Sequence, residues 1–188
     1  FGRDRETIDE AYPGDVVGLV NPGLFTIGDT LTSDPALTFD PIPHFPPECF
    51  GLLRTQDISK HKQFQKGLKQ LEEEGVMQIF YSPDHVRREP VLAAVGQLQF
   101  DVVMSRLENE YGVKTSVERL PHALARWIVG DPATISAVYW PSDTIRLVDQ
   151  QGRGVMLFTT EHLLAYCIKS NPSIKFLLRE EVEQTSAQ

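Results

Sequence analysis

The sequence of 188 residues predicts an α+β fold with a βαββαβ unit, a second α/β unit of similar order, and the last strands of a β-barrel before them. Three observations support this prediction. Four prolines fall within residues 40–47 and predict a stiff, extended linker, because proline fixes φ and removes a backbone donor. After the linker, two helical segments end alike, in EEEGV and NEYGV. Before it, Gly-Asp and Pro-Gly pairs alternate with short β-branched runs, which is typical of turns and strands.

The N-terminal segment, EAYPGDVVGLVNPGLFTIGDTLT at residues 10–32, contains two predicted strands, at 16–20 and 24–27. Asn21-Pro22-Gly23 separates them, and Gly14-Asp15 and Gly28-Asp29 flank them. An incomplete barrel exposes strand edges, so we expect this segment to be mobile or paired with another molecule. The chain starts at Phe1 without an initiator methionine, and we therefore expect it to be the back part of a longer protein.

Residues 50–120 alternate between strand and helix patterns. Strands are predicted at 50–54, 76–81, 91–95 and 113–120, and helices from Asp57 or Ser59 to about Glu74 and from about Gln97 to Tyr111. Glycine at the left-handed position followed by an apolar residue ends both helices. The order β-α-β-β-α-β, as two βαβ halves of one antiparallel sheet, predicts a ferredoxin-like unit. The apolar helix positions are Phe64, Leu68, Leu71, Leu98, Val102, Val103 and Leu107.

The last third repeats this order. Strands are predicted at 124–129, 145–148, 155–158 and 174–178, with Gln151-Gly152-Arg153-Gly154 as the turn of a hairpin. Asp131-Pro132 begins a short helix, with aspartate as N-cap and proline at the first helical position. A second helix runs from Thr160-Glu161 through 169, followed by a polar tail at 180–188. Its inward residues are predicted to be Leu163, Leu164, Cys167 and Ile168. The predicted domains are 1–43 and 44–188, the latter divided into 44–120 and 121–188.

The charge is uneven along the chain. The net charge is −8 at pH 7, and the excess of acidic residues lies mainly in residues 1–48. The remaining residues are nearly neutral overall and can therefore still form local basic faces. The two cysteines, Cys49 and Cys167, form no metal-binding spacing, and a reducing cytoplasm is the expected compartment. No apolar run approaches the ~20 residues that cross a bilayer, so no membrane partner is predicted.

No catalytic, cofactor or metal site is predicted. The sequence has no glycine-rich phosphate loop of the G-x-x-x-x-G-K-[ST] type and no G-x-S-x-G nucleophile elbow. Glu72, Glu73 and Glu74 are consecutive on a helix and point in different directions, so they are expected to form a solvated face. The histidines are scattered, without zinc-site spacing: His44, His61, His85, His122 and His162.

The helix after Ser59 has its lysines first and its glutamates last, against the preference of the helix dipole. Two readings stay open: an ordinary charged surface helix, or a cationic face for a phosphate backbone. The loop before residue 91 carries a basic pair, Arg87 and Arg88, as a second candidate contact. The resulting contact candidates are Arg54, Lys60, Lys62, Lys66, Lys69, Arg87 and Arg88.

With these elements in place, residues 90–120, PVLAAVGQLQFDVVMSRLENEYGVKTSVERL, resemble the third domain of elongation factor G-type proteins. The segment departs from their glycine-Glu-Leu-His-Leu pattern, with Gly96-Gln97-Leu98-Gln99-Phe100 in its place. VGQLQFDVV together with Ala125-Arg126-Trp127 resembles the class II peptide chain release factors of bacteria. The GD…GDTL pattern of the N-terminal segment is similar to the closing strands of the second domain of ribosomal translation GTPases.

This resemblance implies a ribosome-dependent GTPase that removes class I release factors from the ribosome after peptide release. Its GTP and Mg²⁺ site is expected in an N-terminal domain outside this chain, so the chain itself is expected to be non-enzymatic and without a cofactor. Residues 1–43 would form the C-terminal end of domain II. Residues 44–188 would form domain III, which docks on small-subunit RNA and protein at the factor-binding site and couples nucleotide state to conformational change.

Two alternatives remain. Another translation GTPase, of the elongation factor G or ribosomal protection type, would continue into further domains. A small-molecule-binding or acylphosphatase-like protein could share a ferredoxin-like fold, because fold alone does not fix function. The latter needs a phosphate loop after its first strand, and Arg54-Thr55-Gln56-Asp57 lacks the glycines for one.

Overall fold

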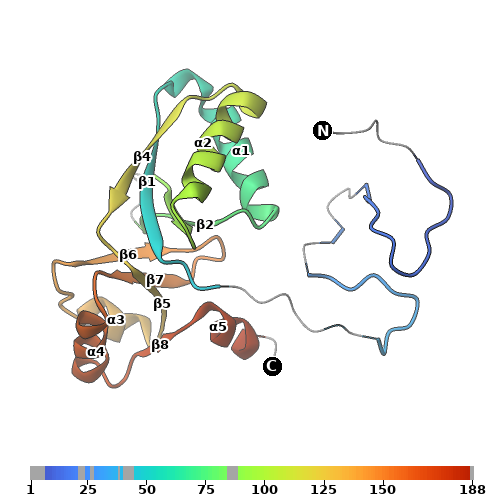
Figure 1. Ribbon diagram of the computed structural model, residues 1–188. Coiled ribbons are helices and arrows are strands. Elements are labelled where there is room, and N and C mark those ends of the chain that lie inside the picture. The colour runs from blue at the N-terminus through green and yellow to red at the C-terminus, as the bar shows by residue number, and fades with distance from the viewer. Residues whose placement is uncertain are drawn as a thin grey trace.

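The computed structural model describes residues 7–20, 24–25, 28–37, 39, 45–83 and 89–186, without the side chains of residues 184–186. From residue 45 onward the chain folds into two successive α+β units (Figure 1). The first comprises β1 (Cys49–Thr55), a 3₁₀ turn (Ile58–Lys60), α1 (His61–Glu73), β2 (Gln78–Phe80), β3 (Val91–Ala94), α2 (Leu98–Tyr111) and β4 (Thr115–Leu120). The second comprises β5 (Leu124–Val129), α3 (Pro132–Ala137), β6 (Thr144–Val148), β7 (Gly154–Phe158), α4 (Glu161–Ser170) and β8 (Lys175–Leu177), followed by α5 (Arg179–Ser186).

Both units have the same sheet topology. The strand orders are β2-β3-β1-β4 and β6-β7-β5-β8, and every pair is antiparallel. In each unit the first and third strands are central and a helix connects each to an outer strand, as a pair of interleaved βαβ halves requires. The predicted ferredoxin-like unit and its repetition are therefore confirmed.

The helix ends follow the local signals in the sequence. The Asp131 carboxylate accepts a hydrogen bond from Thr134 N at 2.8 Å, and Thr160 Oγ1 accepts one from Leu163 N at 3.2 Å, so both act as N-caps. Gly75 and Gly112, after α1 and α2, have φ of 68° and 67°. Glycine adopts this left-handed conformation without the steric cost that a Cβ would bring.

Three hydrophobic cores separate four layers. Because strand side chains alternate, Leu53 faces α1 and α2 while Phe50 faces the second sheet. In the second unit Met156 faces α3 and α4, while Leu157 faces the first sheet. The order is therefore helices, sheet, sheet, helices. Figure 1 shows the α1–α2 pair and the α3–α4 pair at opposite ends of the folded body.

The two sheets are joined at one corner. Tyr81, just after β2, exchanges two backbone hydrogen bonds of 2.8 Å with Val148 at the end of β6. Beside this bridge, the rings of Phe80 and Trp127 meet edge to face with centroids 5.7 Å apart. Backbone pairing and buried aromatic contact thus hold the two units together.

The described part of the expected barrel segment carries no strand. Residues 16–20 have no strand structure, with Val16 and Val20 fully or almost fully exposed, and the described part of 24–27 has none either. A strand gains its hydrogen bonds from a neighbour, and an isolated hairpin is marginal in water. The described part of the chain pairs no other strand with this segment.

The C-terminal tail is also different from its prediction. Residues 179–186 form α5, and Val182 is buried in the inter-sheet core. Glu181 accepts a hydrogen bond from Leu178 N at 2.6 Å, which satisfies one backbone donor at the start of this helix. One buried valine among polar residues is too weak a pattern to indicate the helix. Three helix residues predicted to be apolar contacts are exposed rather than buried: Leu98, Val102 and Ile168.

Replacing Gly67 by alanine tests how closely α1 and α2 pack. A Cβ at this position would lie 2.7 Å from Leu107 Cδ2 and 3.0 Å from Tyr111. We expect the overpacking cost of ~1–3 kcal/mol to outweigh the ~1 kcal/mol that alanine gains in a helix. Denaturant unfolding should show a less stable Gly67→Ala. The control is Gly96→Ala, whose Cβ meets nothing within 4 Å. A more stable Gly67→Ala would show that the helices lie further apart.

Candidate functional site

The lysine stripe consists of Lys62, Lys66 and Lys69, spaced i, i+4 and i+7 along α1. This spacing puts the three side chains on one face of the helix, and all three are exposed. The opposite face carries Phe64 and Leu68, which are buried in the core of the first unit. Lys69 Nζ lies 3.5 Å from the Glu73 carboxylate in an exposed ion pair. Such a pair contributes little to the stability of the fold, so Lys69 remains available for contact with a partner. The stripe therefore presents three positive charges on the outer face of α1.

Lys60 has a structural contact of its own. Its Nζ donates a 2.6 Å hydrogen bond to the carbonyl oxygen of Gly112, just after α2. A cation at this end of α2 satisfies a terminal carbonyl and complements the helix dipole. Lys60 thereby ties the start of α1 to the end of α2, and a contact with a partner stays a prediction.

Arg54 does not join the stripe. Leu53 faces the helices, so strand alternation places Arg54 on the other face of the sheet. Its guanidinium lies 3.0 Å from Glu118 and 3.5 Å from Glu89 in two exposed ion pairs. Arg87 and Arg88 lie outside the described residues.

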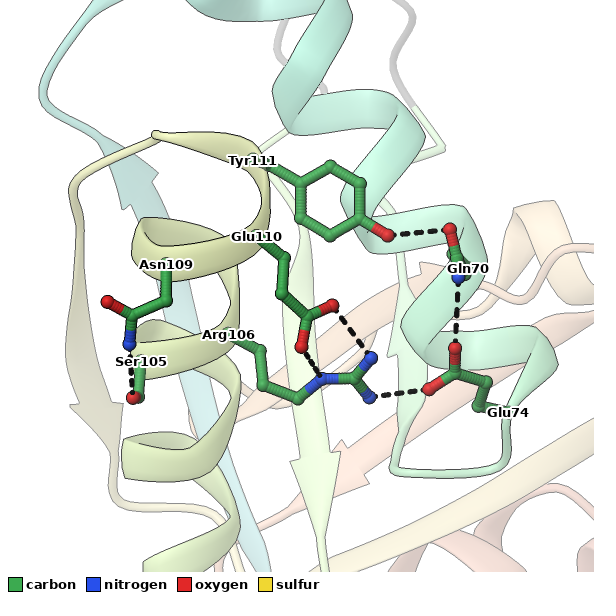
Figure 2. A network of polar contacts seen from close by, with 7 residues as sticks. All are labelled: Gln70, Glu74, Ser105, Arg106, Asn109, Glu110 and Tyr111. Atoms are coloured by element: carbon green, nitrogen blue, oxygen red, sulfur yellow. Dashed lines mark hydrogen bonds and ion pairs between the residues drawn. The ribbon is translucent and has the colours of Figure 1, made fainter. Parts of the chain in front are cut away.

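A chain of polar contacts fixes α1 against α2 (Figure 2). Tyr111 Oη donates to Gln70 at 2.6 Å, and Gln70 Nε2 donates to Glu74 at 3.1 Å. Arg106 donates to Glu74 at 2.5 Å and to Glu110 at 2.7 and 2.9 Å. The hydrogen bonds from Arg106 hold the pKa values of the Glu74 and Glu110 carboxyls below their usual range. The network sets the orientation of the helix that carries the lysine stripe.

A cavity of about 600 Å³ lies between the two units, and we call it the inter-unit cavity. The end of α1 and β2 form one wall, with Glu72, Gln78 and Phe80. The second unit contributes Trp127 and the turn of the β6–β7 hairpin. Residues of the linker, of β3 with the start of α2, and of α5 complete the lining, so widely separated parts of the chain meet here.

Asp149 is the polar centre of the hairpin wall. This buried carboxylate accepts hydrogen bonds from Trp127 Nε1 at 2.8 Å, Arg153 Nε at 2.6 Å, and the backbone N–H groups of Gln151 and Arg153 at 3.0 and 2.9 Å. Its charge is thus paired and hydrogen-bonded, as a buried charge requires. The sequence marked the hairpin but not this aspartate, because nothing local distinguishes it from an ordinary turn residue.

Glu72 corrects the expectation of a solvated glutamate face. Its side chain turns into the inter-unit cavity, where it accepts hydrogen bonds from Ile79 N at 3.3 Å and from Gln150 Nε2. Burial raises the pKa of Glu72 to about 7, against the smaller opposing effect of these donors. The consecutive glutamates therefore diverge, as helical geometry predicts, but one of them is directed inward rather than toward solvent.

The raised pKa of Glu72 predicts a pH-dependent stability. A carboxyl that binds its proton more tightly in the folded state stabilises the fold at low pH, and this contribution is lost as pH rises from 4.5 to about 7. The loss should be about 1–2 kcal/mol, because solvent reaches part of the side chain. Glu72→Gln should remove this contribution and be more stable than the wild type above pH 7. Denaturant unfolding between pH 4.5 and 8 measures the difference, with the exposed Glu73→Gln as control; equal pH profiles for wild type and Glu72→Gln would contradict it.

Two further searches concern the part of the chain that the structure describes. Within it, no three histidine, cysteine, aspartate or glutamate side chains are grouped so that they could hold a metal ion. None of its helices combines the length and the apolar character that a membrane crossing demands.

The fold and the surface define the chain as a module of two packed ferredoxin-like units with an outward cationic helix. Comparison with known families is specific. The family described as class II release factor RF3, C-terminal domain, matches residues 39–168, and the chain belongs to this family. Elongation factor G domain 2 matches residues 1–34, the segment predicted to end a barrel.

Curated relatives agree with this assignment. The chain is 49% identical over 177 residues to peptide chain release factor 3 of Gloeobacter violaceus, covering 94% of this chain and 33% of that protein. It is 49% identical over 175 residues to the Nostoc punctiforme protein of the same name, covering 93% and 32%, and 48% identical to that of Trichormus variabilis over the same length and shares. The chain thus spans about a third of the length of these relatives.

Proposed function

We propose that this chain is the C-terminal, non-catalytic region of a ribosome-dependent GTPase that promotes the removal of class I release factors during translation termination. Residues 44–188 would dock on small-subunit RNA and protein, and residues 1–43 would belong to the preceding barrel domain. GTP and Mg²⁺ would be held by a domain outside this chain. The protein would act in the cytoplasm. Support comes from membership of the RF3 C-terminal family and from the barrel-domain match at residues 1–34.

The observation that carries ribosome docking is the lysine stripe. Three exposed cations on one helix face, with no buried role, suit contact with a phosphate backbone or an acidic protein surface. The overall charge of −8 does not oppose this, because association depends on the local field of the contacting face. Lys60 remains a candidate contact at the start of the same helix.

The inter-sheet core supports the proposed coupling of nucleotide state to movement. The two units share buried residues from both sheets, so a displacement of one is transmitted to the other. The proline-rich stretch at 40–47 would let this body turn as a whole relative to the barrel domain. A conformational change in the nucleotide-binding part could then reposition the lysine stripe.

Co-sedimentation with 70S ribosomes across a salt series tests the proposal. The chain should bind at low salt and dissociate as salt rises, because released counterions oppose a phosphate contact. A full-length relative, such as the Nostoc punctiforme protein, is the positive control. If the relative sediments with ribosomes and this chain stays in the supernatant at every salt concentration, the chain does not carry a docking surface of its own.

A further inference from the structure

Several hydrogen-bond donors of the inter-unit cavity are already in use. Trp127 Nε1 and Arg153 Nε donate to Asp149, and Arg179 Nε donates to Glu183 at 2.7 Å. The amides do the same: Gln99 Nε2 donates to Val76 O at 3.1 Å, and Gln150 Nε2 donates to Glu72. These donor atoms of the cavity wall are therefore engaged within the protein.

Acceptors, in contrast, are left over. The buried Oε1 of Gln78 has no hydrogen-bond partner in the structure, and Gln78 lines both this cavity and a smaller one beside it. An unpartnered buried polar atom costs about 1–3 kcal/mol, so such atoms need an explanation. The Glu72 carboxylate accepts two hydrogen bonds, from Ile79 N and Gln150 Nε2, while a carboxylate can accept about four.

Glu72 also lacks a counter-ion. Its neighbours are paired, Glu73 with Lys69 and Glu74 with Arg106. Within residues 45–83 and 89–183, no lysine or arginine forms an ion pair with Glu72. The positive charge of Arg179 has only a small lowering effect on the pKa of Glu72, and the negative charge of Asp149 raises it. The cavity therefore has one uncompensated carboxylate that a cation would complement.

Apolar side chains form part of the wall around this carboxylate. Phe80, Val76, Ala93 and Trp127 line the cavity, and the exposed ring of Phe45 stands at the linker side. An apolar wall beside an unpaired carboxylate suits a long side chain that buries its methylene stem and presents a charged head. A free polyamine carries several charges along its length, whereas the other carboxylates of the lining are already paired, Glu73 with Lys69, Glu74 with Arg106 and Asp149 with Arg153.

We propose that the inter-unit cavity binds the guanidinium of an arginine side chain on a partner polypeptide, with Glu72 as its counter-ion and Gln78 Oε1 as a second acceptor. Arginine is favoured over lysine because its planar fork donates to two acceptors at once. The bound side chain would contact both units and the linker. It would therefore hold them in one arrangement. This site is separate from the lysine stripe and does not depend on ribosome docking.

Calorimetric titration of the whole chain at pH 8 with the acetylated, amidated peptide Leu-Arg-Leu tests the proposal. The matched peptide replaces arginine by citrulline, which has the same shape without the charge. We expect the arginine peptide to bind about 10-fold more tightly or better, equivalent to ~1.4 kcal/mol. Glu72→Gln should bring this ratio to about 1 while Glu73→Gln keeps it. Binding of the arginine peptide should weaken from pH 8 to pH 6, because Glu72 then takes up a proton.

Three outcomes would overturn the proposal. Equal binding of the arginine and citrulline peptides to the wild-type chain would exclude charge recognition, and this comparison needs no variant. Absence of binding at millimolar peptide would exclude a site for an arginine side chain. Spermidine binding more tightly than the peptide and displacing it would assign the cavity to a free polyamine instead.

Discussion

Reversing the charges of the lysine stripe, in Lys62→Glu combined with Lys66→Glu and Lys69→Glu, is expected to weaken ribosome binding by about 10-fold or more near physiological salt. Three cations that approach phosphates are replaced by three groups that repel them. The salt dependence of binding should become shallower at the same time, since fewer counterions are released. Co-sedimentation with 70S ribosomes between low and physiological salt measures both quantities.

The same substitutions should leave the fold intact, which separates a binding effect from a folding effect. The three side chains are exposed, and at position 62, in the first turn of α1, an acid interacts favourably with the helix dipole. The matched control reverses three exposed cations of the second unit, Arg146, Lys169 and Lys175. Net charge then changes equally in both variants. If the control variant loses as much binding as the stripe variant, the effect is one of overall charge and the stripe has no specific role.

Phe80→Ala is expected to cost about 3–5 kcal/mol in the free energy of unfolding. Phe80 is 1% exposed, lies in the core between the sheets and contacts Trp127 edge to face. Its removal leaves a cavity that the two rigid sheets cannot easily close. Denaturant unfolding followed by circular dichroism gives the stability of the whole chain, and the fluorescence of Trp127 and Trp140, both in the second unit, reports on that unit.

Tyr139→Ala is the control for loss of an aromatic ring. Tyr139 is 95% exposed, so the substitution should change stability by no more than ~0.5 kcal/mol. Because Phe80 belongs to the first unit and Trp127 to the second, both probes should shift together in Phe80→Ala. A shift of the circular dichroism transition with no change in the tryptophan transition would mean that the two units unfold independently.

The elements that the sequence predicted well are those with local signals. Glycines after α1 and α2, the N-cap Asp131 and the helix start at Thr160-Glu161 are signals within a few residues of the chain, and the structure confirms each. The lysine stripe is likewise readable, because lysines spaced i, i+4 and i+7 on a helix share a face whatever the tertiary fold. Its function stays a prediction, since exposure alone does not distinguish a contact face from a solvated one.

The features that the sequence could not predict depend on contact between the units. Whether Glu72 faces solvent or a cavity is decided by Gln150, which comes from the second unit. Val182 makes α5 a folded element because the inter-sheet core receives it. Conversely, the apolar run at 16–20 carries a clear strand pattern, yet a strand needs a neighbour that the described residues do not supply. Local pattern specifies an element, and its tertiary partners decide whether it forms.

The most direct test of the account is photo-cross-linking from the lysine stripe on the ribosome. A benzophenone placed at position 66 of the chain, beside a second sample labelled at position 169 on the far unit, would be irradiated in complex with 70S ribosomes. The account predicts cross-links to small-subunit RNA or protein from position 66, and few or none from position 169. Cross-links from position 169 alone, with position 66 unreacted, would show that the opposite face of the molecule meets the ribosome and would contradict it.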